Sequence, residues 1–383
     1  MPRSLEDAPT TVPVRLGERS YDIAVADGGW DALPAFLKPA LERSWAGRGC
    51  LKALILTDDH VAKLPYPGLV ARALGSLGIE ATTSVVPHGE ASKGLATAAG
   101  LYEELVATAA DRHTLVVAVG GGVIGDLGGF VAATFARGLP LLMVPTTLLA
   151  QVDSSVGGKV GVNLPKVKNI VGSFHQPIAV WIDVASLNDL PDRELRCGLA
   201  EVVKYGVILD AAFFDSLEAD AEAILGRRPE SLRRIVARSC ELKADVVSKD
   251  EREETGLRAV LNFGHTIGHA VEATAGYGGA FQHGEAVAVG MVAESRLAER
   301  LGWVGRDFTT RLTRLLDRFG LPTSIAGLDP GPLLESMARD KKNQGGRIRL
   351  VLPRRMGHVE LTDAAETADL KNLLDDLCGP APL

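Results

Sequence analysis

The glycine triplet Gly120–Gly122 has the sequence context of a phosphate-binding turn. It follows an apolar run, Leu115–Val119, which is typical of a buried strand, and it precedes apolar residues at helical spacing from Val123 to Val131. A strand, a glycine turn and a helix in this order direct free backbone N–H groups, and the positive end of the helix, at a phosphate. Glycines also serve tight turns and close helix packing, so the triplet alone leaves both interpretations open.

Polar residues are dense in the segment that follows. Thr146 and Thr147 come at the end of a second apolar strand, Leu139–Val144, and α/β sheets place ligands beyond the ends of their strands. A carboxylate, hydroxyl groups, glycines and ammonium groups then follow closely: Asp153, Ser154, Ser155, Gly157, Gly158, Lys159, Lys168 and Asn169. This mixture suits a polyhydroxylated, phosphorylated ligand. The alternative is a long solvated loop, which is uncommon in a compact domain unless it is functional.

Three histidines and a glutamate in the second half of the chain could bind a metal. Glu201 and Lys204 are three apart in a helical pattern, and His265 and His269 are four apart, so each pair shares a helix face. His283 adds a further imidazole, and two imidazoles with one carboxylate leave coordination positions open, as catalytic zinc sites do. The spacing differs from the H-E-x-x-H motif of metalloproteases. Histidine pairs are more often incidental, so the residues alone also leave a structural role open.

The elements that must position these residues change in character near residue 188. Before it, apolar strands alternate with helices, which predicts an α/β, Rossmann-like domain with a mostly parallel sheet and helices on both faces. After it, helical periodicity dominates from Asp192 to Ala338, and two short strands are expected at Arg347–Leu352 and Gly357–Leu361. We therefore predict an N-terminal domain over residues 1–188 and an all-helical C-terminal domain over residues 189–383.

Two early segments of the chain carry further expectations. Val12–Ala26 is expected to form a strand pair at the edge of the sheet, and His60–Leu74 is expected to form a helix. Asp58 follows an apolar strand, where an acid can either bind ribose hydroxyls or cap the next helix. After the strand Thr82–Val86 comes HGEASK, which contains Glu90 and Lys93 and reads as a surface loop.

Composition limits the classes of protein and partner. The 383 residues suffice for two domains, and 46% hydrophobic with 23% charged residues is ordinary for a globular protein. A net charge of -7 argues against nucleic acid or an anionic membrane as a partner. The four cysteines have no pairing or metal-binding spacing, the N-terminus lacks the apolar core of a signal peptide, and the longest apolar region is interrupted by charges. A cytoplasmic protein is expected.

The segment Gly120–Pro177 resembles the core of the 3-dehydroquinate synthase family. The resemblance continues through several blocks in the family's order: GLAEVVKYG at Gly198–Gly206, the block Ser239–Ala273 with NFGHTIGH, HGEAVAVGMV at His283–Val292, and DKKNQGGRIRLVLP at Asp340–Pro353. These blocks cover nearly the whole chain from about Asp58 onwards. The wider sugar-phosphate cyclase superfamily shares most of them.

The resemblance implies a reaction. A 3-dehydroquinate synthase converts 3-deoxy-D-arabino-heptulosonate 7-phosphate into 3-dehydroquinate and phosphate, as part of the shikimate pathway to aromatic amino acids. It does so by NAD-mediated transient oxidation, phosphate elimination, reduction and intramolecular aldol closure. The implied cofactors are NAD and a divalent metal, with zinc first and cobalt as a replacement. The implied assembly is a homodimer, in which Arg137 reaches the phosphate site of the neighbouring subunit.

The resemblance also carries roles to individual residues. The implied metal ligands are Glu201, His265 and His283. The residues implied to contact NAD are Asp58, Glu90, Lys93, Gly121, Gly122, Val123, Asp126, Thr146, Thr147, Asp153, Lys159 and Lys168. Those implied to bind the substrate are Arg137, Asp153, Lys159, Lys168, Asn169, Lys204, Lys243, Arg258, Asn262, His269 and one of Lys341 and Lys342. Within this set, the implied catalytic residues are Lys159, Lys204, Arg258, Asn262 and His269.

Three other functions remain as alternatives. A valiolone-type or inosose-type cyclase would act on a sugar phosphate without a carboxylate, and by resemblance Lys243, Arg258, Asn262 and His269 together favour the carboxylated substrate. A metal-dependent polyol dehydrogenase would consume NAD and accumulate NADH, whereas a cyclase would release phosphate with no net change in NADH. A catalytically silent NAD-binding protein would not need the full set of metal ligands and cations.

Overall fold

The chain divides into two units by its internal contacts. The computed structural model describes residues 8–45, 51–165, 167–276, 280–325, 328–338 and 348–378. Unit 1 comprises Met1–Leu190 and Leu232–Arg252, and unit 2 comprises Pro191–Ser231 and Glu253–Leu383. Helix α7 (Pro229–Lys249) therefore contributes most of its length to unit 1, although it follows the first helices of unit 2 in the sequence.

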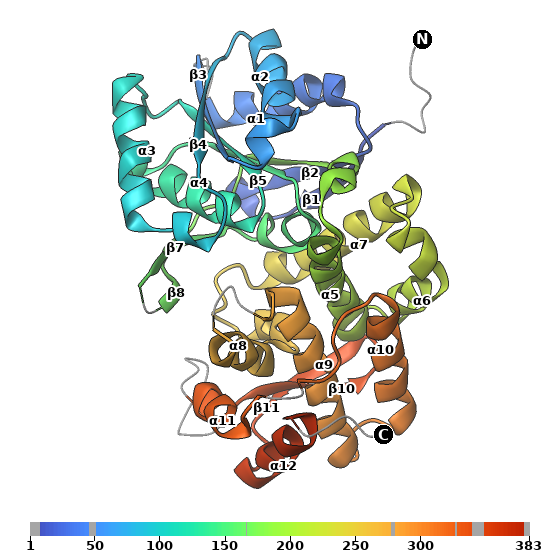
Figure 1. Cartoon of the computed structure of the whole chain (residues 1–383). Coiled ribbons are helices and arrows are strands. Elements are labelled where there is room, and N and C mark those ends of the chain that lie inside the picture. The colour runs from blue at the N-terminus through green and yellow to red at the C-terminus, as the bar shows by residue number, and fades with distance from the viewer. Residues whose placement is uncertain are drawn as a thin grey trace. The chain divides into compact units, whose positions relative to one another are not determined.

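Unit 1 is built on a seven-stranded sheet of order β1-β2-β9-β6-β5-β3-β4 (Figure 1). Its strands are β1 (Thr10–Val14), β2 (Tyr21–Ala26), β3 (Lys52–Asp58), β4 (Glu80–Val86), β5 (Leu115–Gly120), β6 (Leu141–Pro145) and β9 (Ala179–Asp183). Every neighbouring pair is parallel except β1 with β2, the antiparallel pair at the edge. The mostly parallel sheet and its edge strand pair are thus confirmed.

Helices cover both faces of this sheet. The side chains of successive strand residues point to opposite faces, so the apolar strands present apolar side chains on both. Val117 of β5 belongs to a buried cluster with Leu37 of α1 (Leu33–Trp45) and Val70 of α2 (Tyr66–Ser76). The next residue, Ala118, faces α4 (Gly122–Thr134), where a β-carbon at Gly128 would lie 3.0 Å from the Ala118 Cβ. Helix α3 (Leu95–Ala107) packs against α4.

The helix expected over His60–Leu74 is broken in the structure. A short 3₁₀ turn covers Val61–Lys63, and α2 begins only at Tyr66. Leu64 has an extended backbone because Pro65 follows it, and a residue before proline is disfavoured in the helical region. The prediction followed the apolar periodicity and wrongly continued the helix across Pro65.

The polar segment after β6 is folded into regular structure. A π-helical turn covers Ala150–Ser154, and a separate antiparallel hairpin follows, formed by β7 (Lys159–Leu164) and β8 (Val167–Phe174). Strand β7 packs on α4, where a β-carbon at Gly129 would lie 2.2 Å from Val160 Cγ1. The solvated-loop alternative is wrong for the described part of this segment.

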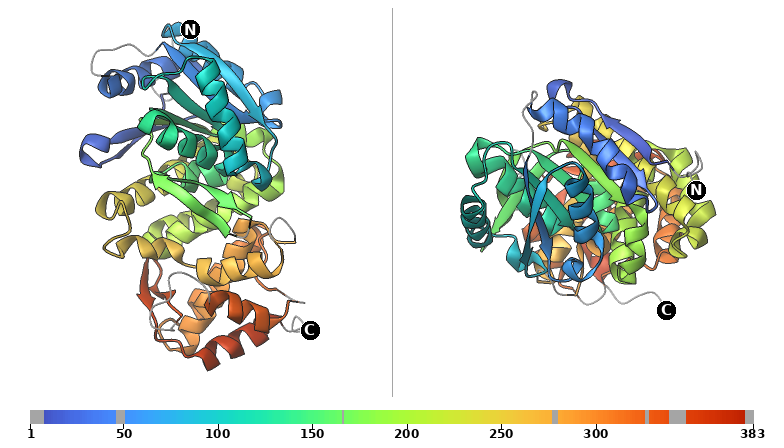
Figure 2. Two further views of the ribbon diagram at one scale, coloured as in Figure 1. Left: turned by 90° about the vertical axis from the view of Figure 1, so that its left-hand side faces the viewer. Right: turned by 90° about the horizontal axis from the view of Figure 1, so that it is seen from above.

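Where the structure describes it, unit 2 is helical apart from one hairpin. Its helices are α5 (Asp192–Leu209), α6 (Ala211–Leu225), α8 (His265–Thr274), α9 (His283–Arg300), α10 (Arg306–Arg318), α11 (Pro330–Ala338) and α12 (Thr367–Cys378). The hairpin is β10 (Leu350–Arg355) with β11 (His358–Thr362), which pair only with each other. Residues of α8, α9, α11, α12 and β10 form one buried cluster, and the orange and red elements lie together in the left view of Figure 2. The predicted helical character is confirmed.

Across the described residues, no helix combines the length and apolar composition needed to cross a bilayer.

Candidate active site

The glycine turn joins β5 to α4 with the geometry that the sequence predicted. Strand β5 ends at Gly120, Gly121 is extended, and α4 begins at Gly122 with no side-chain cap on its first N–H groups. A β-carbon at Gly121 would lie 3.1 Å from Thr147 Cγ2, and one at Gly122 would lie 3.2 Å from Ser154 Oγ. These close approaches favour glycine, and the uncapped helix start leaves N–H groups for an anion.

A π-helical turn holds Asp153 near this glycine turn. Such turns are rare and are frequently found at functional sites. The buried ammonium of Lys243, on α7, donates to the Asp153 carbonyl oxygen at 2.5 Å and to its carboxylate Oδ1 at 2.6 Å. The structure therefore brings together two residues that are far apart in the sequence and that the resemblance assigned to the substrate site.

The HGEASK segment is tied to α4 and to the β7–β8 hairpin. The Lys93 ammonium, 4% exposed, lies 2.5 Å from Asp126 Oδ2 on α4. Glu90 Oε2 accepts a hydrogen bond from Asn163 Nδ2 at 2.7 Å, and Asn163 Oδ1 accepts one from the Asn169 backbone N–H at 2.9 Å. Asn163 thus connects two residues assigned to ligand binding, Glu90 and Asn169.

Asp58 caps the turn that follows β3. Its carboxylate Oδ1 accepts hydrogen bonds from the backbone N–H groups of His60 and Val61, both at 2.9 Å. Of the two roles left open for Asp58, the capping role is therefore visible in the structure.

Four more of the assigned residues of unit 1 lie at its surface. Lys159 and Asn169 are exposed and Lys168 is half-buried, and all three lie on the β7–β8 hairpin. Asn169 has a left-handed backbone with φ of 53°. Arg137 is exposed and also left-handed, with φ of 68°, in the short turn that follows α4.

In unit 2, a buried carboxylate faces two imidazole rings. Glu201 Oε1, on α5, lies 3.5 Å from His265 Nε2 on α8 and 3.9 Å from His283 Nε2 on α9. Both Glu201 oxygens are buried without a well-oriented hydrogen bond among the described residues, although the Lys204 ammonium lies against Oε2. Lys204 supplies a cation at Oε2, whereas Oε1 faces the two imidazoles and has no hydrogen-bond donor among the described residues, a position that favours a further cation. The donor set and its spacing therefore fit a divalent metal ion.

Hydrogen bonds orient both imidazoles toward the carboxylate. His265 Nδ1 donates to the Phe263 carbonyl oxygen at 3.1 Å, and His283 Nδ1 lies 3.0 Å from Glu272 Oε2. In each ring, Nε2 is therefore left to face Glu201. Metal-binding histidines are commonly oriented in this way, by a hydrogen bond from the ring nitrogen that does not bind the metal. Burial lowers the pKa of His265 well below its ordinary value, and Lys204 acts in the same direction, so this imidazole is neutral at pH 7.

Of the other residues assigned to unit 2, His269 lies beside this trio. The His269 ring is centred 5.4 Å from the His265 ring and 6.1 Å from the His283 ring. Arg258 is 3% exposed, and its Nε lies 3.6 Å from Glu253 Oε1. Asn262 ends the same 3₁₀ turn, Leu257–Asn262. Lys341 and Lys342 lie outside the described residues.

Models of the 3-dehydroquinate synthase family match most of this chain. The N-terminal model matches residues 83–197 and the C-terminal model matches residues 198–343. A 3-dehydroquinate synthase of Pelobacter propionicus is 48% identical over 348 residues, which are 91% of this chain and 94% of the relative. The chain belongs to the 3-dehydroquinate synthase family. It is therefore an enzyme, and the resemblance read from the motifs is confirmed.

Solved structures of related cyclases share the fold of this 3-dehydroquinate synthase family member. A 2-deoxy-scyllo-inosose synthase complexed with carbaglucose-6-phosphate, NAD⁺ and Co²⁺ has a TM-score of 0.85 at 27% identity, covering 96% of this chain and 99% of that one. A 2-epi-5-epi-valiolone synthase from Streptomyces hygroscopicus subsp. jinggangensis 5008, with NAD⁺ and Zn²⁺ bound, has a TM-score of 0.82 at 27% identity, covering 93% and 96%.

Sequence reasoning missed the residues that hold the site in shape. Gln151 is fully buried, and its Nε2 donates to the Pro145 and Asp183 carbonyl oxygens and to Ser186 Oγ, which ties the π-helical turn to the ends of β6 and β9. Asn163 and Glu272 were also missed. The signal available for Gln151 was one uncharged polar residue in an otherwise apolar run, which does not identify its partners.

Close backbone contacts at glycines set the positions of the metal-site helices in this 3-dehydroquinate synthase family member. A β-carbon at Gly290 of α9 would lie 1.9 Å from the carbonyl oxygen of Gly264, the residue that precedes His265. A β-carbon at Gly284, also on α9, would lie 2.1 Å from the Cys197 carbonyl oxygen on α5. Helix α9 therefore touches the backbones that carry the other two candidate ligands.

Glu272→Gln is expected to weaken metal binding by about 10-fold to 100-fold, because the amide holds the His283 ring less strongly than the carboxylate does. Equilibrium dialysis against Co²⁺ measures the change. Glu335→Gln is a matched control, since Glu335 lies on α11 and is not one of the residues Glu201, His265, His283 and Glu272. Unchanged Co²⁺ affinity in Glu272→Gln would mean that this carboxylate does not position His283.

Proposed function

We propose that this protein is a 3-dehydroquinate synthase that converts 3-deoxy-D-arabino-heptulosonate 7-phosphate into 3-dehydroquinate and phosphate. The observation that carries the proposal is the buried Glu201 carboxylate facing the Nε2 atoms of His265 and His283, in a chain of this family. In this proposal, bound NAD supplies a reversible hydride acceptor and a divalent metal, zinc first, supplies a Lewis acid. The relatives with NAD⁺ and Zn²⁺ or Co²⁺ bound support both cofactors.

The residues of unit 1 would bind the dinucleotide. The uncapped start of α4, at Gly121, Gly122 and Val123, offers N–H groups to the pyrophosphate. Thr146 and Thr147 follow the end of β6 beside this turn. The pairs Lys93–Asp126 and Lys243–Asp153 hold their charged groups in fixed positions, so that the cofactor and substrate meet a rigid polar surface. We accordingly propose residues 1–188 as the NAD-binding domain and residues 189–383 as the metal- and substrate-binding domain.

The cations and amides that the resemblance assigns to the substrate would bind its two anionic groups. Lys159, Lys168, Asn169, Lys204, Arg258, Asn262 and His269 supply ammonium, guanidinium, amide and imidazole donors. Holding the intermediate by several such contacts makes the aldol closure effectively unimolecular. His269, exposed beside His265 and His283, can move a proton to or from the substrate phosphate.

We further propose that the protein is a cytoplasmic homodimer with no nucleic-acid or membrane partner. The net charge of -7 supports the exclusion of polyanions. Arg137, exposed in a left-handed turn, is suited to reach a neighbouring subunit's phosphate site. Sedimentation analysis of the whole chain tests the dimer.

The reaction is tested by its stoichiometry. With the heptulosonate phosphate, zinc and NAD in catalytic amount, phosphate release should far exceed the NAD present, and absorbance from NADH should show no net change. Phosphate release from a sugar phosphate without a carboxylate, but not from this substrate, would identify a valiolone-type or inosose-type cyclase instead. NADH accumulating in step with turnover would identify a dehydrogenase.

Lys159→Ala is expected to lower kcat/KM about 100-fold, because a charge-assisted contact to an anion contributes roughly 1.5–3 kcal/mol. The matched control is Lys52→Ala on the same unit, where the ammonium donates to the Thr108 carbonyl oxygen at 2.8 Å beyond the end of α3. Removing Lys52 is expected to change stability slightly and the rate very little. Equal losses of rate in the two variants would reject a substrate role for Lys159.

A further inference from the structure

A second cluster of imidazole and carboxylate groups lies at the edge of the unit 1 sheet. Asp59 and His60 follow β3, and His88 follows β4. These two strands are parallel neighbours in which Asp58 pairs with Val86, so the residues just beyond them emerge at the same edge. The Asp59 backbone N–H donates to the Val86 carbonyl oxygen at 3.0 Å, which fixes the two backbones against each other.

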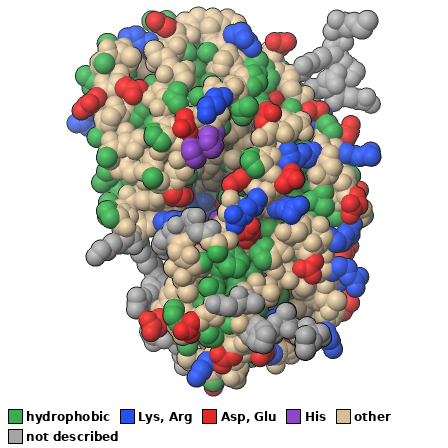
Figure 3. All heavy atoms as spheres, viewed as in Figure 1, with side chains coloured by type: hydrophobic (Ala, Val, Ile, Leu, Met, Phe, Trp, Pro, Cys, Tyr) green, Lys and Arg blue, Asp and Glu red, His purple; other side chains and the backbone are tan. Residues whose placement is uncertain are grey.

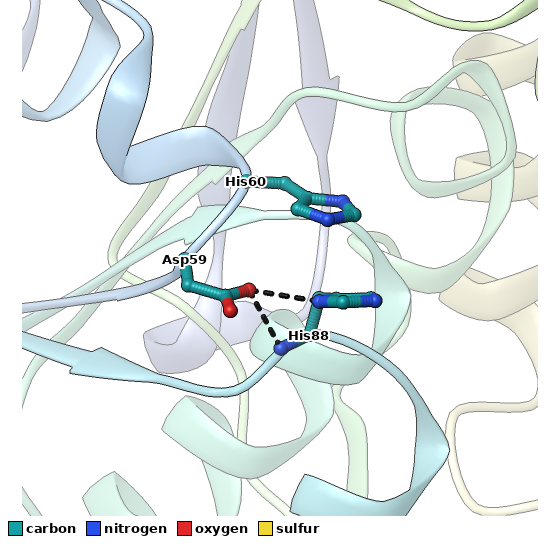
Figure 4. A group of neighbouring side chains, drawn as sticks. All are labelled: Asp59, His60 and His88. Carbon is teal, nitrogen blue, oxygen red and sulfur yellow. Dashed lines mark hydrogen bonds and ion pairs between the residues drawn. The ribbon is translucent and has the colours of Figure 1, made fainter.

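The His88 side chain contacts both of the others directly (Figure 4). Asp59 Oδ1 accepts a hydrogen bond from the His88 backbone N–H at 3.0 Å and lies 2.9 Å from His88 Nδ1. The His60 and His88 rings are stacked, with centroids 3.7 Å apart and planes 20° apart. Both histidines are exposed, and Figure 3 shows histidine side chains together at the surface beside an acidic side chain.

We propose that Asp59, His60 and His88 form a second site for a divalent transition metal ion of the zinc class. One potential ligand atom from each residue lies within 4.8 Å of the other two. Ligand atoms in a tetrahedral zinc site are about 3.4 Å apart, given metal–ligand distances of about 2.1 Å. Rotation of His60 and a slight separation of Asp59 Oδ1 from His88 Nδ1, now 2.9 Å apart, would complete a set of two imidazoles and one carboxylate. This set suits zinc, cobalt, nickel and copper and disfavours magnesium and calcium.

Binding requires one rearrangement, which the structure permits. A coordinated imidazole holds the ion in its own ring plane, so two nearly parallel stacked rings cannot share one ion. The His60 ring must rotate out of the stack, and its exposed side chain has room to change rotamer. His88 must carry its proton on Nε2, which points away from Asp59 in Figure 4. The carboxylate is already held in place by the His88 backbone N–H.

A simpler role for the cluster is an exposed ion pair. The pKa of the Asp59 carboxyl is lowered by its hydrogen bonds from His88. An exposed pair of this kind contributes little to stability, and it leaves the position of His60 unexplained. The two interpretations differ in one measurable quantity, the number of metal ions bound.

Equilibrium dialysis of the metal-free whole chain against Co²⁺, with metal and protein quantified, tests the proposal. We expect two ions per chain, and one ion in His88→Ala and in Asp59→Asn. The matched control His113→Ala, an imidazole of unit 1 outside the cluster, should retain two. Two results would overturn the proposal. One is that the variants His88→Ala and Asp59→Asn each still bind two ions. The other is that the unchanged protein binds a single ion and His88→Ala binds it as well.

The same measurement separates this site from the site of the proposed reaction. His283→Ala is expected to lose the ion held by Glu201, His265 and His283, and to keep the ion held by Asp59, His60 and His88. The double variant His88→Ala with His283→Ala should bind neither. If His283→Ala loses nothing while His88→Ala loses one ion, the ligand assignment in unit 2 fails and the present proposal stands. Circular dichroism of each variant establishes that the loss is local.

Discussion

His283→Ala is expected to reduce kcat at least about 1000-fold, which corresponds to roughly 4 kcal/mol of lost transition-state stabilisation. The substitution removes one of the three possible ligands Glu201, His265 and His283. In the structure, His283 Nε2 lies 3.9 Å from Glu201 Oε1. It also leaves Glu272 without the imidazole that lies 3.0 Å from its carboxylate. Two protein ligands would hold a divalent ion only weakly, so we expect the variant to lose the ion and the Lewis acid that it would supply.

The measurements for this variant separate chemistry from folding. Phosphate release gives kcat, dialysis gives the metal content, and fluorescence titration gives the affinity for NAD, which should change little because the residues proposed for NAD lie elsewhere in the chain. His113→Ala serves as the control for loss of an imidazole outside both clusters. Normal turnover of His283→Ala in a metal-replete preparation would reject His283 as a ligand.

Gly290→Ala is expected to destabilise unit 2 by about 3 kcal/mol and to weaken metal binding at the same time. The new β-carbon would lie 1.9 Å from the Gly264 carbonyl oxygen and 3.0 Å from the Gly268 nitrogen, and neither backbone atom can rotate away. Helices α8 and α9 must therefore separate, and they carry His265 and His283. The gain in helix propensity from glycine to alanine, about 1 kcal/mol, is too small to offset this overlap.

The urea midpoint of unfolding and the Co²⁺ affinity measure the two effects of Gly290→Ala. The control is Gly100→Ala, because Gly100 is an exposed interior residue of α3 with no atom within 4 Å of its added β-carbon. That variant should be as stable as the unchanged protein or more stable by up to about 1 kcal/mol. An unchanged midpoint for Gly290→Ala would show that the two helices tolerate a wider separation.

The sequence by itself determined the family, the alternation of strands and helices in the first half, and the helical character of the second. These properties are local: a buried strand, a glycine turn and an amphipathic helix each follow from the residues within one short segment. The turn Gly120–Gly122 was therefore predicted together with both of its flanking elements. Where two local roles were compatible, as for Asp58, the sequence could not decide between them, and the backbone hydrogen bonds to His60 and Val61 show the cap.

Only the tertiary structure decided which distant residues meet. Glu201 reaches His265 and His283 because α9 contacts both α5 and α8 at glycine backbones, and the strand pairing of β3 with β4 brings His60 onto His88. No periodic pattern encodes such contacts, since they depend on how whole elements pack and on which backbones can approach closely. The chemistry of each side chain is a property of the sequence, whereas its partners are a property of the packing.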